Sequence, residues 1–340
     1  MKASRVSELR RREFLARTAA LGATGLLGMA RQALAADPPP ETTRVRLVHT
    51  PFICLAPQYL AAEFFPMEGI SDSEYLQFGS RSGGIDAIVE GRADITMWDV
   101  HSPIPMIDAG KPIVVLAGVH GGCFELFGNE SVRAIRDLKG KTSAVHYLGG
   151  GDHVLLASML AHVGIDPTNG VNWTTGRGAD AKDVFASGKA DAFMGFAQEP
   201  AELRAKNVGR VILNTATDRP WSQYYCCVVI ANRDFVARNP VATKRVLRSI
   251  LKASDICAAD PERVARFLVD MRYETRYPIG LEVMKNTSYT RWRHDSPEDT
   301  LRFHALRLRE AGMIKSTPQK LIAQGTDWRF LNQLKQELKA

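Results

Sequence analysis

The sequence contains an internal repeat, and no other feature constrains its fold as much. Gly-Arg-Ala-Asp at residues 91–94 recurs as Gly-Lys-Ala-Asp at residues 188–191, an offset of 97 residues. The same offset, kept without a gap, pairs His49 with His146. Repeats of this kind indicate supersecondary units that are built alike. The repeat therefore predicts two similar lobes, in each of which a helix ends at glycine and a strand begins at the Ala-Asp step.

Short β-forming runs alternate with helical patterns from Arg44 onward. Helical patterns fill the gaps between these runs, for example at residues 85–90 and 153–163. This alternation predicts parallel sheets that are covered by helices on both faces. The expected strands are residues 45–49, 74–78, 94–98, 113–119, 142–146, 171–174, 191–196 and 211–213.

The pattern changes after Tyr224, where a β-rich run at residues 225–230 leads into helical sequence. Pro240, Pro261 and Pro297 each stand where a helix would begin. The second repeat is therefore expected to be an insertion, after which the chain returns to the first lobe. The expected C-terminal helices are residues 233–239, 241–259, 262–271, 297–311 and 328–339.

These patterns predict the domain organisation. Lobe 1 comprises residues 44–121 and 226–340, and lobe 2 comprises residues 122–225. The chain would cross between the lobes twice, near residues 119–124 and 224–229, and the two crossings would form a hinge. A flexible leader with three successive prolines, residues 36–43, precedes lobe 1.

The first 35 residues have the pattern of an export signal. Arg11 and Arg12 precede Phe14 in a twin-arginine motif, and an Ala- and Gly-rich apolar stretch follows. That stretch is too short and too weakly apolar to span a bilayer. Ala-Leu-Ala at residues 33–35 provides the small-x-small pattern for signal peptidase. We expect export to the periplasm through the twin-arginine route, followed by removal of the signal.

Removing this segment changes the charge of the protein. The full chain holds 44 basic and 37 acidic residues, and residues 1–35 account for seven of the former and two of the latter. The mature chain would then be nearly neutral, with 37 basic and 35 acidic residues. The high isoelectric point belongs largely to the signal, so the composition does not predict nucleic-acid binding.

The spacing of the five cysteines fits neither a disulfide framework nor a zinc motif. A bridge from Cys123 to Cys226 or Cys227 remains open, but buried free thiols are the expected state, as they also are for Cys54 and Cys257. We expect neither a bound metal nor a cofactor.

Six motifs spread over most of the chain carry a family resemblance. They are residues 56–61, 91–94, 109–112, 137–141, 188–192 and 235–240. With them the chain resembles the nitrate/sulfonate/taurine-binding family of periplasmic solute receptors, which share a fold with the pyrimidine synthases of thiamin biosynthesis. The resemblance implies an α/β type II periplasmic binding protein fold, with two doubly wound lobes joined by a two-strand hinge. It also implies a small-molecule ligand that is delivered to an ABC permease and its ATPase. We expect the protein to be a monomer.

Ligands in open α/β sheets bind beyond the carboxyl ends of the strands. Two glycine-rich loops, residues 79–84 and 149–153, stand at such places before a helix. Their N–H groups, together with Arg81, suit an oxyanion. The loops therefore predict an anionic solute such as a sulfonate, taurine, a carboxylate or nitrate. Ordinary turn chemistry is the alternative explanation.

Other candidates stand at paired strand ends, where they would set specificity. The full expected ligand-binding set is Ser80, Arg81, Ser82, Asp99, His101, His146, Tyr147, Gly150, Asp152, His153, Gln198 and Glu199. The histidines near strand ends, together with Asp99 and Glu199, also suggest a metal site. Neutral, hydrogen-bonded histidines are the preferred interpretation.

The expected function is solute capture by hinge closure for an ABC importer, and not catalysis. The sequence has no nucleophile elbow, phosphate-binding loop or paired zinc-ligand motif. The alternative is a cleft enzyme related to the pyrimidine synthases that needs a metal or cofactor. The cysteine-rich run of those enzymes has only Cys226-Cys227 as its nearest counterpart here. A receptor that signals through a membrane sensor also remains open.

Overall fold

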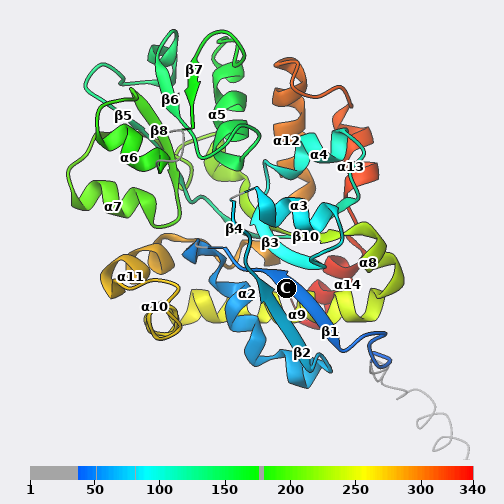
Figure 1. The fold of residues 1–340 in the computed structure, drawn as a ribbon. Coiled ribbons are helices and arrows are strands. Elements are labelled where there is room, and N and C mark those ends of the chain that lie inside the picture. Colours follow the sequence, from blue (N-terminus) through cyan, green and yellow to red (C-terminus); the bar gives the residue numbers. More distant parts are fainter. Residues whose placement is uncertain (1–36, 51, 81, 176–179, 340) are drawn as a thin grey trace, which may run out of the picture. The chain divides into compact units, whose positions relative to one another are not determined.

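The β-strands form two groups, which are here called lobe 1 and lobe 2. The structure is a computed structural model, and it describes residues 37–50, 52–80, 82–175 and 180–339. Lobe 1 holds the ladders β1-β2 and β3-β10-β4, and lobe 2 holds the five-stranded sheet β7-β6-β8-β5-β9, drawn in green shades (Figure 1). The strands are β1 Arg44–Val48, β2 Asp72–Leu76, β3 Ile95–Asp99, β4 Ile113–Gly121, β5 Phe124–Gly128, β6 Thr142–Ala144, β7 Asn172–Thr174, β8 Ala192–Phe196, β9 Arg210–Asn214 and β10 Tyr225–Asn232.

Helices cover both groups of strands. Those of lobe 2 are α5 Gly151–His162, α6 Ala181–Ala186 and α7 Glu199–Ala205. Those of lobe 1 are α2 Ala56–Leu60, α3 Gly83–Val89, α4 Pro103–Asp108, α8 Arg233–Arg238, α9 Pro240–Ala259, α10 Pro261–Asp270, α11 Tyr277–Asn286, α12 Pro297–Glu310, α13 Pro318–Gly325 and α14 Arg329–Glu337. No helix among the described residues is long and apolar enough to cross a bilayer.

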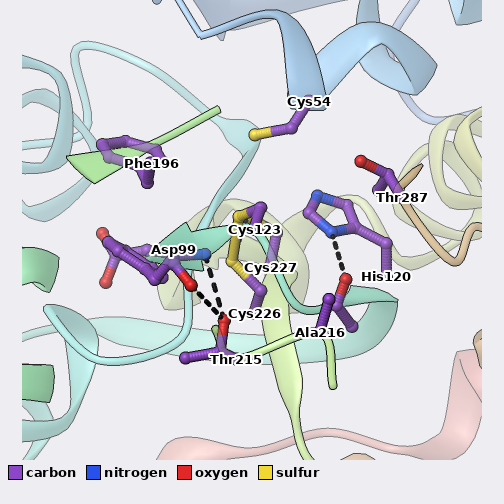
Figure 2. Close-up of a disulfide and its surroundings, with 12 residues drawn as sticks. Cys54, Asp99, His120, Cys123, Phe196, Thr215, Ala216, Cys226, Cys227 and Thr287 are labelled. Carbon is purple, nitrogen blue, oxygen red and sulfur yellow. Dashed lines mark hydrogen bonds between the residues drawn. A yellow bond between two sulfur atoms is a disulfide. The ribbon is translucent and has the colours of Figure 1, made fainter. Parts of the chain in front are cut away.

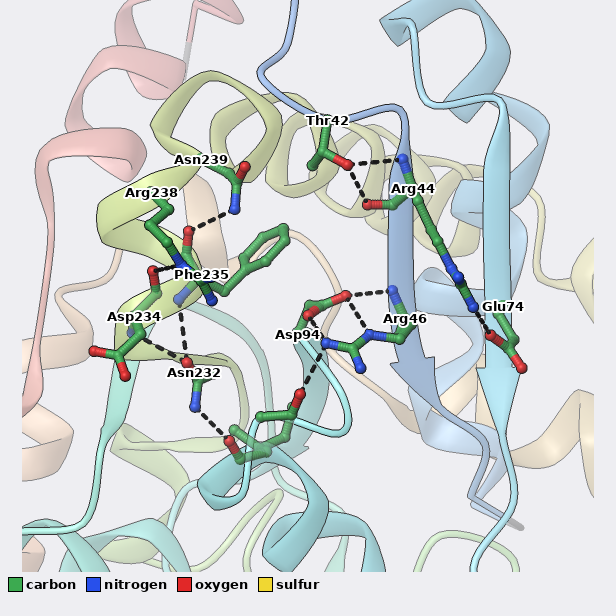
Figure 3. A network of polar contacts seen from close by, with 12 residues as sticks. Thr42, Arg44, Arg46, Glu74, Asp94, Asn232, Asp234, Phe235, Arg238 and Asn239 are labelled. Atoms are coloured by element: carbon green, nitrogen blue, oxygen red, sulfur yellow. Dashed lines mark hydrogen bonds and ion pairs between the residues drawn. The ribbon is translucent and has the colours of Figure 1, made fainter.

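The Ala-Asp step of the repeat has the same structural role in both lobes. In lobe 1 the Asp94 N–H donates to the Arg46 carbonyl oxygen (2.8 Å), and its Oδ2 accepts from the Arg46 N–H (2.8 Å), as Figure 3 shows in part. In lobe 2, Asp191 makes the same two bonds with Thr142, at 2.8 and 2.9 Å. These bonds place β1 beside β3 and β6 beside β8. The strand orders of the two lobes are therefore equivalent, and the α/β fold with two similar lobes is confirmed.

The ungapped pairing of His49 with His146 is wrong by one residue. Asp94 lies 48 residues after its partner Arg46, whereas Asp191 lies 49 residues after Thr142. Lobe 2 thus carries one more residue between β6 and its Ala-Asp step than lobe 1 carries between β1 and its own. His146 is consequently equivalent to Thr50, the residue after His49.

The expectation of parallel sheets is corrected in part, because both lobes also contain antiparallel pairs. β10 runs antiparallel to β3 and β4, and β5 runs antiparallel to β8 and β9. Each of these two strands enters its sheet directly after the chain crosses from the other lobe, so it runs opposite to the strands around it. β5 itself was not predicted. Its sequence FELFG is buried throughout but contains Glu125, which interrupts the apolar run and forms an ion pair with Arg204.

A disulfide joins the two crossings, which corrects the expected free thiols at Cys123 and Cys226. The carbonyl oxygen of Cys226 accepts from Val100 N–H (2.9 Å), and that of Cys123 accepts from the Ala197 N–H (3.1 Å). Val100 and Ala197 are equivalent under the 97-residue repeat, so the bridge links equivalent positions of the two lobes. Cys54, Cys227 and Cys257 are free and buried, as expected.

Helices α9, α10 and α12 begin at the prolines that predicted them, and α12 packs against α5 of lobe 2. α9 lies against α2, and its residues Val246, Leu247 and Ile250 are fully buried. The carboxylate of Glu41, in the segment expected to be a flexible leader, accepts hydrogen bonds from the first N–H groups of α9 (3.0–3.1 Å). Two further helices, α11 and α13, were not predicted. The expected export signal, residues 1–35, lies outside the described residues.

Candidate functional site

A cavity lies where the two lobes meet, next to the crossings. It encloses about 440 Å³ of empty space, part of which is open to the solvent. Lobe 1 lines it with Thr50, Phe52, Leu55, Trp98, Asp99 and Cys227, and lobe 2 lines it with Phe124, His146, Tyr147, Gly151, Asp152 and Phe196.

Asp99 brings a carboxylate into the cavity at the end of β3. Its Oδ1 accepts from the backbone N–H groups of His101 (2.9 Å) and Ser102 (2.8 Å), and its Oδ2 accepts from the Ser102 hydroxyl (2.7 Å). Burial raises the pKa of Asp99 to about 6, although the hydrogen bonds from Ser102 and His101 act to lower it. Asp99 is therefore ionised at neutral pH, and it becomes protonated in mildly acidic solution.

The Asp99 carboxylate lies against the first turn of α5 in lobe 2. A Cβ atom at Gly151 would come within 2.4 Å of Cγ and Oδ1 of Asp99, so glycine is required for this approach. A helix N-terminus attracts negative charge through its free N–H groups and its dipole. The Asp99 carboxylate thus lies at the start of α5, where the sequence analysis expected the anionic group of a solute.

His146 lies between two buried carboxylates of lobe 2. Its Nδ1–H donates to Oδ2 of Asp152 (2.9 Å), and its Nε2–H donates to Oε1 of Glu199 (2.8 Å). The three side chains are only 3%, 2% and 5% exposed. Burial acts to lower the pKa of His146, but the charges of Glu199 and Asp152 and their hydrogen bonds outweigh it and raise the pKa to about 10. His146 is therefore an imidazolium, the only form in which both ring nitrogens donate.

Aromatic rings from both lobes meet at the cavity. Phe52, from the loop after β1, lies with its ring centroid 3.9 Å from that of Phe196 at the end of β8. The ring of Phe124 is stacked on that of Phe196, with the two centroids 4.8 Å apart. With Trp98 and Tyr147 these rings give the cavity flat apolar walls.

Four of the expected binding residues line the cavity: Asp99, His146, Tyr147 and Asp152. Glu199 reaches it indirectly, through its hydrogen bond to His146. Gly150 is the N-cap residue of α5, where a Cβ atom would meet Asp152 and Tyr147. Of the lobe 2 residues that line the cavity, the sequence had thus named His146, Tyr147 and Asp152.

Other expected residues lie elsewhere. Ser80 is exposed, and neither it nor Ser82 lines the cavity. His101 is buried behind the site, where its ring contacts Phe124 and His304. His153 packs on Trp173 and accepts from the Gly149 N–H, and Gln198 Oε1 accepts from the Ile53 N–H at 3.5 Å. Arg81 lies outside the described residues.

The cavity residues missing from the expected set are mainly apolar. Phe196 stands one repeat after Asp99 and is the last residue of its strand, so the 97-residue offset could have found it. Phe124 and Cys227 belong to the crossing strands β5 and β10, which had been assigned to the hinge alone. Their sequence pattern carries no sign of a ligand site.

Comparison with known families agrees with this architecture. A family model described as NMT1/THI5 like matches residues 54–264, more than half of the chain. The chain belongs to this family. The match covers all six motifs that carried the expected resemblance to periplasmic solute receptors.

Solved structures similar to this family member show the same fold. The periplasmic nitrate-binding protein NrtA from Synechocystis PCC 6803 is 18% identical with a TM-score of 0.73, over 89% of this chain and 90% of that chain. The alkanesulfonate-binding protein SsuA from Xanthomonas axonopodis pv. citri is 17% identical with a TM-score of 0.68, over 85% and 99%. The desulfurization enzyme DSZB is 12% identical with a TM-score of 0.55, over 87% and 99%. These likenesses confirm the periplasmic binding protein fold. No curated protein sequence matches the chain.

Proposed function

We propose that this protein is the periplasmic solute-binding component of an ABC importer. The observation that carries the proposal is the aromatic cavity, which both lobes line directly beside the two crossings. In such a geometry, rotation about the crossings opens and closes the site around a solute. Lobe 1 at residues 44–121 and 226–340 and lobe 2 at residues 122–225 would be the moving bodies. A permease with its ATPase would receive the solute from the monomeric, exported protein.

The chemistry of the cavity favours a planar solute with an amino group or a protonated nitrogen. Among the described lining residues, Asp99 and Asp152 are acidic and none is arginine or lysine. His146 is already held by Asp152 and Glu199, so its charge is compensated inside the protein. An anionic group beside the Asp99 carboxylate would be repelled without a described cation to offset it. This weighs against the sulfonate, taurine, carboxylate or nitrate expected from the glycine-rich loops.

The test is a thermal-shift and calorimetry panel with the protein from residue 36 onward. Benzylamine, benzamidine and aminopyrimidines are compared with taurine, an alkanesulfonate and nitrate. Binding to the native state alone raises stability by about 2.7 kcal/mol at a hundredfold excess over Kd. We expect shifts from amino-aromatic compounds and none from the anions. Stabilisation by the anions alone would overturn the solute class, and no shift with any compound would count against the receptor.

Replacing Asp99 with asparagine is predicted to weaken amino-aromatic binding by about 10- to 100-fold, because a charge-assisted hydrogen bond contributes about 1.5–3 kcal/mol. The free energy of unfolding should not decrease. Since the folded state raises the pKa of Asp99 to about 6, the ionised carboxylate costs stability above that pH, and asparagine removes the cost. Calorimetry and urea unfolding at pH 7 measure the two effects. The control is Asp183→Asn, at an exposed position of α6. Equal binding losses in both variants would refute a role for Asp99.

Replacing Gly151 with alanine is predicted to prevent closure. The new methyl group would overlap the Asp99 carboxylate, while alanine within the first turn of α5 is otherwise favourable for the helix. We expect at least a tenfold loss of solute affinity and a larger radius of gyration in small-angle scattering. Gly79→Ala, which meets nothing within 4 Å, is the matched control. Unchanged affinity in Gly151→Ala would contradict the closure model.

A cleft enzyme related to the pyrimidine synthases is the alternative function. Mass spectrometry of the bound solute after prolonged incubation separates the two, because a receptor returns its solute unchanged.

A further inference from the structure

Three cysteines and one histidine gather beside the solute cavity. Cys54 lies in the short 3-10 turn Ile53–Leu55, His120 in β4, Cys123 at the first crossing and Cys227 in β10. One ligand atom of each lies within 4.8 Å of those of the other three. Figure 2 shows the sulfur of Cys54 and the ring of His120 facing the Cys123–Cys226 bridge. Four segments that are distant in sequence thus bring thiols and an imidazole to one point.

His120 provides independent evidence that a ligand belongs at this point. Its side chain is fully buried, and its Nδ1 lies 3.3 Å from the carbonyl oxygen of Gly121. Its Nε2 is also buried, and it has no hydrogen-bond partner among the described residues. A proton on Nδ1, donated to the Gly121 carbonyl, leaves the lone pair of Nε2 available to a metal ion, with the Cys54 thiol as a side-chain neighbour of His120. This is the usual arrangement of a metal-binding histidine, in which a backbone carbonyl holds the other ring nitrogen.

The donor set selects a particular class of metal ion. Thiolate and imidazole ligands suit zinc and other thiophilic transition metals, and they suit magnesium and calcium poorly. Bonds of about 2.3 Å to sulfur and about 2.0 Å to nitrogen place tetrahedral ligands roughly 3.5–3.8 Å apart. The observed separations lie within 4.8 Å, so contraction by about 1 Å would close the site.

We propose that Cys54, His120 and Cys227 bind a thiophilic divalent metal ion of the Zn²⁺ type, and that Cys123 completes the tetrahedron when its disulfide is reduced. The Cys123 sulfur is bonded to Cys226 in this structure, so it can bind the metal ion only after the disulfide is broken. A two-electron reductant such as a dithiol converts that bridge into two thiols and is itself oxidised to a disulfide. Each cysteine then loses its proton to solvent as its sulfur binds the ion.

An open groove gives the metal ion access to the proposed site. Cys54, His120 and Cys227 are fully buried, but Cys123 is only half-buried. Cys123 lines an open groove of about 1320 Å³ together with Ala216 and Thr287, on residues separate from those of the solute cavity. The site would join the loop after β1 to both crossings. It does not depend on the proposed solute function.

The test uses the full chain, stripped of metal by a chelator and kept either oxidised or reduced with a phosphine. Co²⁺ serves as the spectroscopic probe and Zn²⁺ as its competitor. We expect one Co²⁺ per chain, with thiolate-to-cobalt charge-transfer absorption that Zn²⁺ abolishes. Reduction should increase the Zn²⁺ affinity at least tenfold by adding the fourth ligand. The spectrum of the unaltered chain needs no variant, so it decides the proposal even if a variant does not fold.

Variants then assign the ligands. Cys54→Ser and His120→Gln should each lower the Zn²⁺ affinity at least tenfold, whereas Cys257→Ser, at a buried thiol outside the cluster, should leave it unchanged. Absence of a cobalt–thiolate band in both redox forms would overturn the proposal. Wild-type affinity in Cys54→Ser, or an equal loss in Cys257→Ser, would overturn it as well.

Discussion

Replacing His146 with glutamine is expected to lower the free energy of unfolding by about 3–5 kcal/mol, the usual cost of breaking a buried ion pair from one side. The imidazolium lies between Asp152 and Glu199, and all three side chains are almost completely buried. Glutamine keeps a similar size but brings no charge. The two carboxylates would then remain buried without a compensating cation. Urea unfolding at pH 7 measures the loss.

The pH dependence provides a second measure of the same interaction. The folded state raises the pKa of His146 to about 10 from an ordinary value of 6.5. The stabilisation is therefore fully present below about pH 6.5 and is lost as the pH rises through about 10. The difference in stability between the wild type and His146→Gln should shrink over that interval. His162→Gln, at an exposed position of α5, is the control and should cost little. A loss below 1 kcal/mol for His146→Gln, or a difference independent of pH, would contradict the buried ion pair.

Removing the bridge between the crossings is expected to have a comparable effect. Cys123 and Cys226 are separated by 103 residues, and a cross-link that closes a loop of this length restricts the unfolded chain by about 4.7 kcal/mol in the entropic model. Native disulfides contribute about 2–5 kcal/mol in practice. We therefore expect the double variant Cys123→Ala with Cys226→Ala to unfold at clearly lower urea concentration than the wild type.

A reductant separates this effect from the loss of buried sulfur atoms. Reduction should lower the unfolding midpoint of the wild type and of Cys257→Ala, since both keep the bridge. It should leave the double variant unchanged. A wild-type midpoint in the double variant, or a double variant that still responds to reductant, would show that the bridge does not stabilise the protein.

Much of the fold could be predicted because its signals are local. Prolines at the starts of α9, α10 and α12 marked those helices. Among the residues that the structure describes, β-rich runs marked nine of the ten strands to within a few residues. β5 was missed because Glu125 interrupts its apolar pattern, and that interruption is explained only by an ion pair with Arg204. α11 was missed although it carries proline in its first turn, at Pro278.

The candidate site was predictable only in part. The rule that ligands lie beyond strand ends led to Asp99, His146 and Asp152. It could not show that Asp99 lies against Gly151 or that His146 bonds to Glu199, 53 residues later in the chain. These contacts reverse the interpretation of the glycine-rich helix start from a place for an anionic solute to a place held by a carboxylate of the protein.

The sequence by itself determined the repeat, the α/β class and the return of the chain to lobe 1, because periodicity, prolines and the Ala-Asp step act over a few neighbouring residues. Only the tertiary structure decided which side chains meet. The disulfide, the His146 ion pairs and the Cys54–His120–Cys227 cluster each join segments brought together by the two crossings. Their energies depend on burial and on distances of a few ångströms, and these quantities exist only once both lobes have packed.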